Sequence, residues 1–221
     1  EVSQWHPPLY ENTTPIETPT TPGWHLSEAM ADKAIEWIGQ QKAAAPDKPF
    51  FMYWAPGAGH APHHVAPEWA DRYKGKFDNG WDEQRRLTFE NQKRLGIIPA
   101  DTTLTPRPDS IPAWEACSTD EKRLYTRMQE VYAGFVEHAD VQVGRLLDSL
   151  ETMGVRDNTL VMYCVGDNGP SAEGTLTGTL NSFKTMHGFL DDVPTMLKHI
   201  DEIGGPEHDN HYPVAWAWAG S

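Results

Sequence analysis

The chain has 221 residues, 38% of them hydrophobic, which is enough apolar material for one large domain or two small ones. Its 18 lysine and arginine residues face 32 aspartate and glutamate residues, and the resulting formal charge of −14 disfavours nucleic acids and anionic membrane surfaces as partners. No apolar run reaches the roughly 20 residues of a membrane-spanning helix, and two cysteines are too few for a disulfide scaffold.

Residues 1–54 are predicted to contain an extended segment, a helix and a strand. Residues 1–23 contain five prolines, which predict an extended entry segment on the surface. A helix is expected from about Ser27, whose hydroxyl is suited to cap it, to just before Pro46. The apolar, aromatic run at 49–54 then predicts a strand that is covered on both faces.

The middle of the chain is predicted to be mostly helical. Glycine and proline make 55–64 a loop, and short helices are expected over 67–73 and 82–95. The longest helix is predicted over 119–152, because an apolar stripe at helical spacing follows a capping-box pair, Ser118 and Glu121. Gly154 is placed to end it.

The last third of the chain predicts further strands. A continuous apolar run at 159–165 leads into the polar loop 166–169, and the run at 214–219 is also strand-like. Buried strands separated by helices predict an α/β fold, with a mainly parallel sheet and helices on both faces. Because an apolar segment stands at its end, we interpret the chain as an incomplete piece of a longer protein.

Asp167 and Asn168 are candidate metal ligands, because they directly follow the predicted strand 159–165. Ligands of such sheets bind at the carboxyl ends of the strands, and carboxylate and amide oxygens suit Ca²⁺ or Mg²⁺. The same tripeptide at 78–80 follows no strand and is interpreted as a turn, and a turn remains the alternative at 167–169 as well. Two side chains cannot complete a calcium site, which requires 6 to 8 oxygens.

His60 is a candidate catalytic residue in the loop after the first predicted strand. It could donate a proton to a leaving group or bind an anion. His60, His63 and His64 have a spacing that would suit a zinc site on a helix, but the glycines and prolines around them exclude a helix. The alternative is that a chain with ten histidines simply places a few of them in one loop.

The sequence contains no recognisable nucleophile. Cys164 lies within an apolar run and is predicted to be inert packing, and Cys117 has no catalytic context. Neither a Gly-x-Ser-x-Gly elbow nor a glycine-rich phosphate loop is present. A complete hydrolytic site is therefore not expected within this chain.

Several stretches together resemble the sulfatase family, specifically the bacterial arylsulfatases of the alkaline-phosphatase-like superfamily. The resemblance covers nearly the whole chain, and its most specific parts are 77–82 and the Asp167-Asn168-Gly169 strand exit. The matching stretches are 49–53, 57–63, 69–82, 132–135, 144–145, 166–169, 171–174 and 211–213.

The resemblance implies an alkaline-phosphatase/sulfatase-like fold and roles for three residues. Asp167 and Asn168 match calcium ligands of the family, with Mg²⁺ as the second choice of ion. His60 matches a histidine that contacts the sulfate ester and assists departure of the leaving group. Apart from the resemblance, we expect His64 in the second shell of the site. The family's nucleophile is a formylglycine made in a Cys/Ser-x-Pro-x-Arg motif, which this chain lacks.

We therefore expect residues 1–221 to be the central part of a sulfatase catalytic domain, with the nucleophile region and the C-terminal part outside the chain. The implied reaction is hydrolysis of a small-molecule sulfate monoester, and the chain by itself is expected to be inactive. Two alternatives remain open: a phosphatase or phosphodiesterase of the same superfamily that uses two zinc ions, and a non-catalytic binding module that retains the fold.

Overall fold

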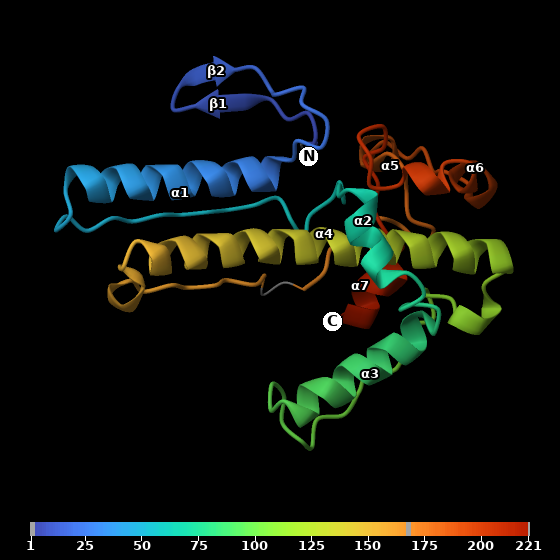
Figure 1. Ribbon diagram of the computed structural model, residues 1–221. Helices are drawn as coiled ribbons and strands as arrows, with labels where there is room; N and C mark the ends of the chain where they lie inside the picture. The colour runs from blue at the N-terminus through green and yellow to red at the C-terminus, as the bar shows by residue number, and fades with distance from the viewer. Residues whose placement is uncertain (1–2, 167–168, 221) are drawn as a thin grey trace.

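The computed structural model describes residues 3–166 and 169–220, and its axis is the long helix α4, Thr119–Thr152 (Figure 1). At 34 residues this helix is about 50 Å long. The Ser118 side chain accepts a hydrogen bond from the Glu121 backbone, and the Glu121 carboxylate accepts one from the Ser118 backbone. Gly154 follows the helix with a positive φ of 68°. The predicted long helix, its capping box and its glycine stop are confirmed.

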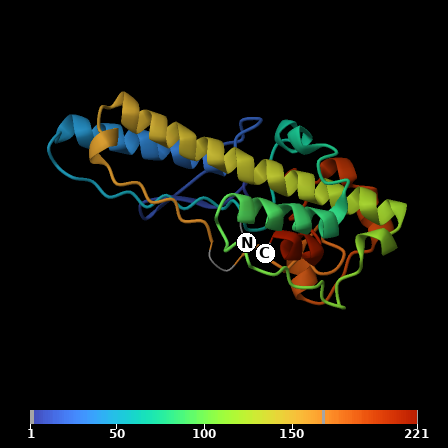
Figure 2. The same ribbon diagram turned by 90° about the horizontal axis from the view of Figure 1, so that it is seen from below.

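Helix α1, Leu26–Ala44, lies alongside the C-terminal half of α4 and runs in the same direction (Figures 1 and 2). Its buried side chains, Ser27, Ala31, Ala34 and Ile38, recur at helical spacing. The cap differs from the prediction, because the ring of His25 rather than the Ser27 hydroxyl accepts the first hydrogen bond, from the Ser27 backbone N–H. In the part of the chain that the structure describes, no helix is both long and apolar enough to span a bilayer.

The predicted short helices are present. α2, Pro67–Ala70, and the 3₁₀ turn η1, Asp71–Tyr73, cross α4 closely at Gly134, where a Cβ atom would lie 2.7 Å from the Ala70 backbone nitrogen. α3, Gly80–Arg94, begins two residues before the predicted start and packs against α7, Val214–Gly220 (Figure 1). The remaining helical pieces are η2 Trp114–Ala116, η3 Arg156–Asn158, α5 Ser182–Met186, α6 Val193–Leu197 and η4 Ile200–Glu202.

The apolar run at 214–219 is a helix, so the predicted strand there is wrong. Alternating alanines mimic the two-residue period of a strand, but alanine is also the best helix former. The helix places Trp216 in a cluster with Trp81 and Trp114, whose ring centroids lie 5.8 Å from that of Trp216. The Trp216 indole also donates to the Tyr125 carbonyl at 2.9 Å. In the helix, the Trp216 side chain is therefore packed against other aromatic rings and hydrogen-bonded.

The parallel sheet is not seen in the described residues, whose strands are β1, Leu9–Glu11, and β2, Thr14–Ile16. They pair antiparallel as a hairpin within the proline-rich entry segment (Figure 1). Asn12 in its turn has a φ of 57°, a conformation that asparagine tolerates better than most residues. The prolines predicted an extended segment, and the hairpin was not predicted.

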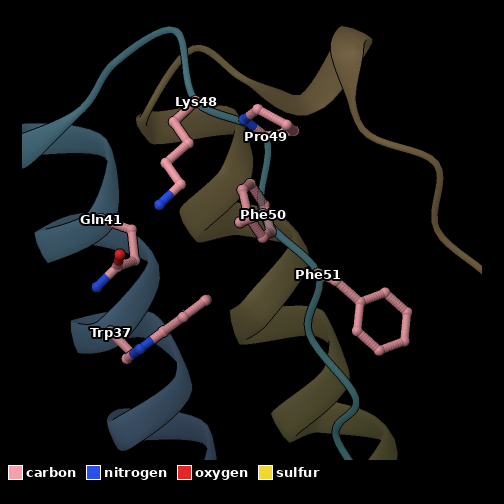
Figure 3. Close-up of a pocket in the computed structure, with 6 residues that line it drawn as sticks. All are labelled: Trp37, Gln41, Lys48, Pro49, Phe50 and Phe51. Atoms are coloured by element: carbon pink, nitrogen blue, oxygen red, sulfur yellow. The ribbon is translucent and has the colours of Figure 1, made fainter.

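The predicted strand at 49–54 is an extended segment without ladder hydrogen bonds in the described structure. Phe50 packs beside Trp37 of α1, with ring centroids 6.5 Å apart, while Phe51 points away from the helix (Figure 3). Phe51 and Tyr53 are 82% and 83% exposed, so the predicted burial on both faces is not seen within the described residues. A shallow pocket beside α1 is lined by Trp37, Gln41, Lys48, Pro49, Phe50 and Phe51 (Figure 3).

The predicted strand at 159–165 is likewise extended and exposed, with Leu160 at 86%. A strand makes no hydrogen bonds within itself, so it forms only where a neighbouring strand is available. No described segment pairs with 160–165 or with 50–54. The apolar patterns of both segments are therefore present without the sheet that would bury them.

Candidate functional site

The loop at 55–65 presents His60 to solvent. Gly59 before it has a φ of 95°, which favours glycine, and the His60 backbone N–H donates to the Gly57 carbonyl at 3.1 Å. The ring Nδ1 of His60 lies 2.8 Å from the Ala61 carbonyl oxygen, to which it donates. Because Nδ1 carries the proton in this arrangement, Nε2 is left as the nitrogen that exchanges protons or binds a ligand. The peptide bond that follows, Ala61–Pro62, is cis.

A carboxylate faces the free nitrogen of His60. Glu173 Oε2 lies 3.8 Å from His60 Nε2, and about 60% of each side chain is exposed. At this distance the carboxylate attracts a protonated imidazole ring, and the exposure of both groups leaves them accessible to a substrate. The pair thus places a carboxylate and an imidazole side by side at the surface.

Residues 171–174 are held in place by the segment at His211 and Tyr212. His211 Nδ1 donates to the Tyr212 carbonyl at 3.0 Å, so its Nε2 accepts from the Ser171 hydroxyl at 3.2 Å. Burial lowers the pKa of His211, which favours the neutral ring that this pattern needs. Gly174 lies so close that a Cβ atom there would be 1.8 Å from the Tyr212 carbonyl oxygen. The backbone that carries Glu173 is therefore closely docked.

The two sides of the site are joined through the segment 204–211. The His63 backbone N–H donates to the Asn210 carbonyl at 3.1 Å, and the Val65 N–H donates to the Gly204 carbonyl at 3.0 Å. On the other side, His211 and Thr179 exchange two backbone hydrogen bonds of 2.9 and 3.0 Å. This arrangement fixes the loop of His60 relative to the rest of the molecule.

His64 is fully buried and holds the N-terminal segment. Its Nε2 donates to the His208 carbonyl at 2.8 Å, and its Nδ1 accepts from the Gln4 backbone N–H at 3.2 Å. Burial lowers the pKa of His64, so that the neutral ring is favoured. Because both nitrogens are engaged, the ring has none left to ligate a metal, and its described contacts are structural.

The candidate metal ligands Asp167 and Asn168 lie outside the described residues. Ser171 and Glu173, which are described, follow them within a few residues along the chain and lie beside His211 and His60. The sequence analysis gave no role to Glu173, Ser171 or His211. Their stretches were part of the family resemblance, but nothing in the sequence pattern pairs a carboxylate with a histidine so far away along the chain.

The donor chemistry of Asp167 and Asn168 suits a calcium ion, since it offers hard oxygens. Another group of potential ligands is described at His199, Glu202 and His208, and two of its three donor atoms are imidazole nitrogens. Nitrogen-rich sets do not suit Ca²⁺ or Mg²⁺. This second group therefore does not replace the predicted calcium ligands.

Comparison with known proteins identifies the family. The family model described as Sulfatase matches residues 2–212. The chain belongs to the sulfatase family. An uncharacterized sulfatase of Schizosaccharomyces pombe is 34% identical over 215 residues, which are 96% of this chain and 37% of that protein. An arylsulfatase of Klebsiella aerogenes is 32% identical over 151 residues, which are 68% of this chain and 32% of that protein.

Membership confirms the predicted resemblance. Sulfatases have the alkaline-phosphatase-like α/β fold, and the family consists of hydrolases that act on sulfate esters. The matches cover about a third of the length of each of the two curated relatives.

Proposed function

We propose that this sulfatase chain is the central part of a catalytic domain that hydrolyses small-molecule sulfate monoesters of the arylsulfatase type. The similarity of this chain to a Klebsiella aerogenes protein named arylsulfatase supports this reaction. The observation that carries the proposal is the exposed His60 ring, with Nδ1 engaged by Ala61 and Nε2 next to Glu173.

In this proposal His60 acts at Nε2. A protonated Nε2 either donates its proton to the oxygen of the departing alcohol or phenol, or donates a hydrogen bond to a sulfate oxygen. The Ala61 carbonyl accepts a hydrogen bond from Nδ1, so Nε2 is the ring nitrogen that faces the substrate, and the Glu173 carboxylate lies 3.8 Å from it. This arrangement leaves Nε2 accessible to an anionic ester.

Asp167 and Asn168 are proposed as ligands of Ca²⁺, with Mg²⁺ as the second choice, and their remaining partners come from outside the chain. A bound calcium ion supplies positive charge that offsets the charge of the sulfate oxygens. The nucleophile is proposed to be a formylglycine, also outside the chain, because the chain has no Cys/Ser-x-Pro-x-Arg motif.

The exposed apolar segments support the proposal that the rest of a larger domain packs here. Residues 49–54 and 159–165 carry strand-like apolar patterns, and Phe51, Tyr53, Leu160 and Met162 are largely exposed. Large exposed apolar patches mark surfaces that are covered by other protein. Strands contributed by the remaining part of the domain would bury both segments in a mainly parallel sheet.

The test is an assay of the complete protein and of the 221-residue chain on 4-nitrophenyl sulfate and 4-nitrophenyl phosphate. The complete protein is expected to hydrolyse the sulfate in preference to the phosphate, and to lose this activity in Asp167→Ala. The chain alone is expected to show no turnover, because its nucleophile is elsewhere. Preference for the phosphate, or hydrolysis by the chain alone, would contradict the proposal.

The alternatives are not favoured. Both curated relatives carry sulfatase names, one of them an arylsulfatase, and neither is named a phosphatase or phosphodiesterase. The match to the family of sulfatases likewise favours a hydrolase over a non-catalytic binding module.

A further inference from the structure

Three potential metal ligands converge within the loop that follows α6. His199 Nδ1 lies 3.0 Å from Glu202 Oε2, and His208 Nε2 lies 2.8 Å from the same oxygen. The three donor atoms lie within 4.8 Å of one another. The two imidazole rings are 5.0 Å apart between centroids and nearly perpendicular, at 69°. Both rings therefore turn one nitrogen toward a shared point.

The backbone holds these residues in position without a metal. The Glu202 N–H donates to the His199 carbonyl at 2.9 Å, which places the first two ligands on one 3₁₀ turn. His208 comes from the other end of the loop, and its carbonyl accepts the hydrogen bond from the buried His64 ring at 2.8 Å. The His208 side chain is only 16% exposed. The site thus joins two parts of the loop whose separation is already fixed.

We propose that His199, Glu202 and His208 bind a Zn²⁺ ion, separate from the proposed calcium site and independent of the proposed sulfatase function. Two imidazole nitrogens and one carboxylate oxygen are a common zinc ligand set, and a water molecule completes the tetrahedron. Zinc–ligand bonds of 2.0 to 2.2 Å place ligand atoms about 3.3 Å apart, so the nitrogens of His199 and His208 move about 0.3 and 0.5 Å away from Glu202 Oε2.

The charges around the site are compatible with a cation. Asp201 and Glu207 are neighbours of the ligands in the sequence, and the Asp209 carboxylate lies 3.8 Å from His64 Nε2. Lys198 is the basic residue next to His199. The chain as a whole carries a formal charge of −14, which also attracts cations. In the zinc-bound form, each neutral ring presents a lone pair to the ion and carries its proton on the other nitrogen.

The test is a Zn²⁺ titration of the complete protein by calorimetry, after removal of metals with a chelator. The unmodified protein is expected to bind one more equivalent of Zn²⁺ than the variants His208→Ala and Glu202→Gln, or to bind it more than about 100-fold more tightly. His187→Ala is the matched control, since His187 is an exposed histidine bonded to the carbonyl of Phe183 in its own helix, and it is expected to keep the site.

Two further measurements keep the outcome interpretable. His199→Gln changes the more exposed histidine, so it tests the site even if His208→Ala unfolds, and circular dichroism checks the fold of each variant. Co²⁺ substitution is expected to give the visible absorption of a tetrahedral site in the unmodified protein and in His187→Ala, but not in the ligand variants. Equal zinc affinity and stoichiometry in all the folded variants would overturn the proposal.

Discussion

At the scale of single residues, the site depends on how the histidines are partnered rather than on how many there are. His60 is exposed with one nitrogen engaged, while His64 and His211 are buried with both ring nitrogens engaged. Burial lowers the pKa of the latter two rings, so they serve as neutral scaffold. Their neighbour His25, which caps α1, is also buried, and its ring donates or accepts at both nitrogens.

The first prediction concerns His25 and acid stability. Burial lowers the pKa of His25 from 6.5 to about 4. Between these pH values the unfolded chain binds a proton that the folded chain does not, so stability is full above pH 6.5 and falls as the pH drops toward 4. His25→Asn keeps a capping side chain but removes the ring, and is expected to make the free energy of unfolding less sensitive to pH in this window.

The measurement for His25→Asn is urea unfolding at several pH values from 4 to 7. The other buried histidines still titrate in the variant, so part of the acid sensitivity remains. A free energy of unfolding that depends on pH equally steeply in both proteins would contradict the pKa assignment.

The second prediction concerns Gly174. A Cβ atom there would lie 1.8 Å from the Tyr212 carbonyl oxygen and 2.6 Å from His211 Nδ1, so Gly174→Ala forces the segment of Glu173 away from its support. Overpacking of this kind typically costs about 1–3 kcal/mol. Gly144→Ala is the control, because Gly144 lies in α4 with no atom within 4 Å of its would-be Cβ.

Gly144→Ala is expected to be neutral or stabilising, since alanine is favoured over glycine in a helix by up to about 1 kcal/mol. Denaturant unfolding of both variants makes the comparison. Equal stability of Gly174→Ala and the unmodified protein would show that the segment is not docked as described.

At the scale of elements, the long helices α1, α3 and α4 were predictable from the sequence, while α7 and the strands were not. The apolar stripe and the capping box of α4 are local signals, and they locate the helix because its hydrogen bonds are internal to it. A strand depends on a partner that the local sequence does not identify, and the segments 49–54 and 159–165 have none among the described residues. Residues 214–219 form a helix although their apolar pattern alternates as in a strand. Alanine favours a helix, and Trp216 packs in the core in this form.

The third prediction tests whether 159–165 is buried by the rest of the domain. Met162 is largely exposed in this chain, and Leu95 is exposed beyond the end of α3. If strands of a larger domain cover Met162, then Met162→Asp destabilises the complete protein by about 2 kcal/mol or more, since an apolar side chain is replaced by a buried charge. Leu95→Asp is the matched control and is expected to change stability by less than about 0.5 kcal/mol.

The thermal unfolding midpoints of the two variants of the complete protein give the answer. A shift for Met162→Asp no larger than that for Leu95→Asp would contradict burial of this segment.

At the scale of the whole molecule, α4 organises the chain, and segments distant in sequence meet beside it (Figure 1). The sequence indicated His60 as a candidate, because a histidine in a glycine-rich loop is a local feature. It did not indicate Glu173, because only the docking of 171–174 on His211 and Tyr212 brings that carboxylate to His60. Asp167 and Asn168 stay a prediction. The family itself was recognisable from stretches spread over nearly the whole chain.

The central claim, that His60 acts on the sulfate ester, is tested most directly by the dependence of His60→Ala on the leaving group. In the complete protein, kcat/KM is measured for 4-nitrophenyl sulfate, which has a good leaving group, and for phenyl sulfate, which has a poor one. His187→Ala is the control and is expected to leave both values unchanged.

The account predicts that kcat/KM of His60→Ala falls about 100-fold or more for phenyl sulfate, as for loss of a general acid. The fall for 4-nitrophenyl sulfate is expected to be smaller if His60 donates the proton to the leaving group, and equal if it contacts the sulfate. A His60→Ala variant that hydrolyses both esters as fast as the unmodified protein would contradict the account.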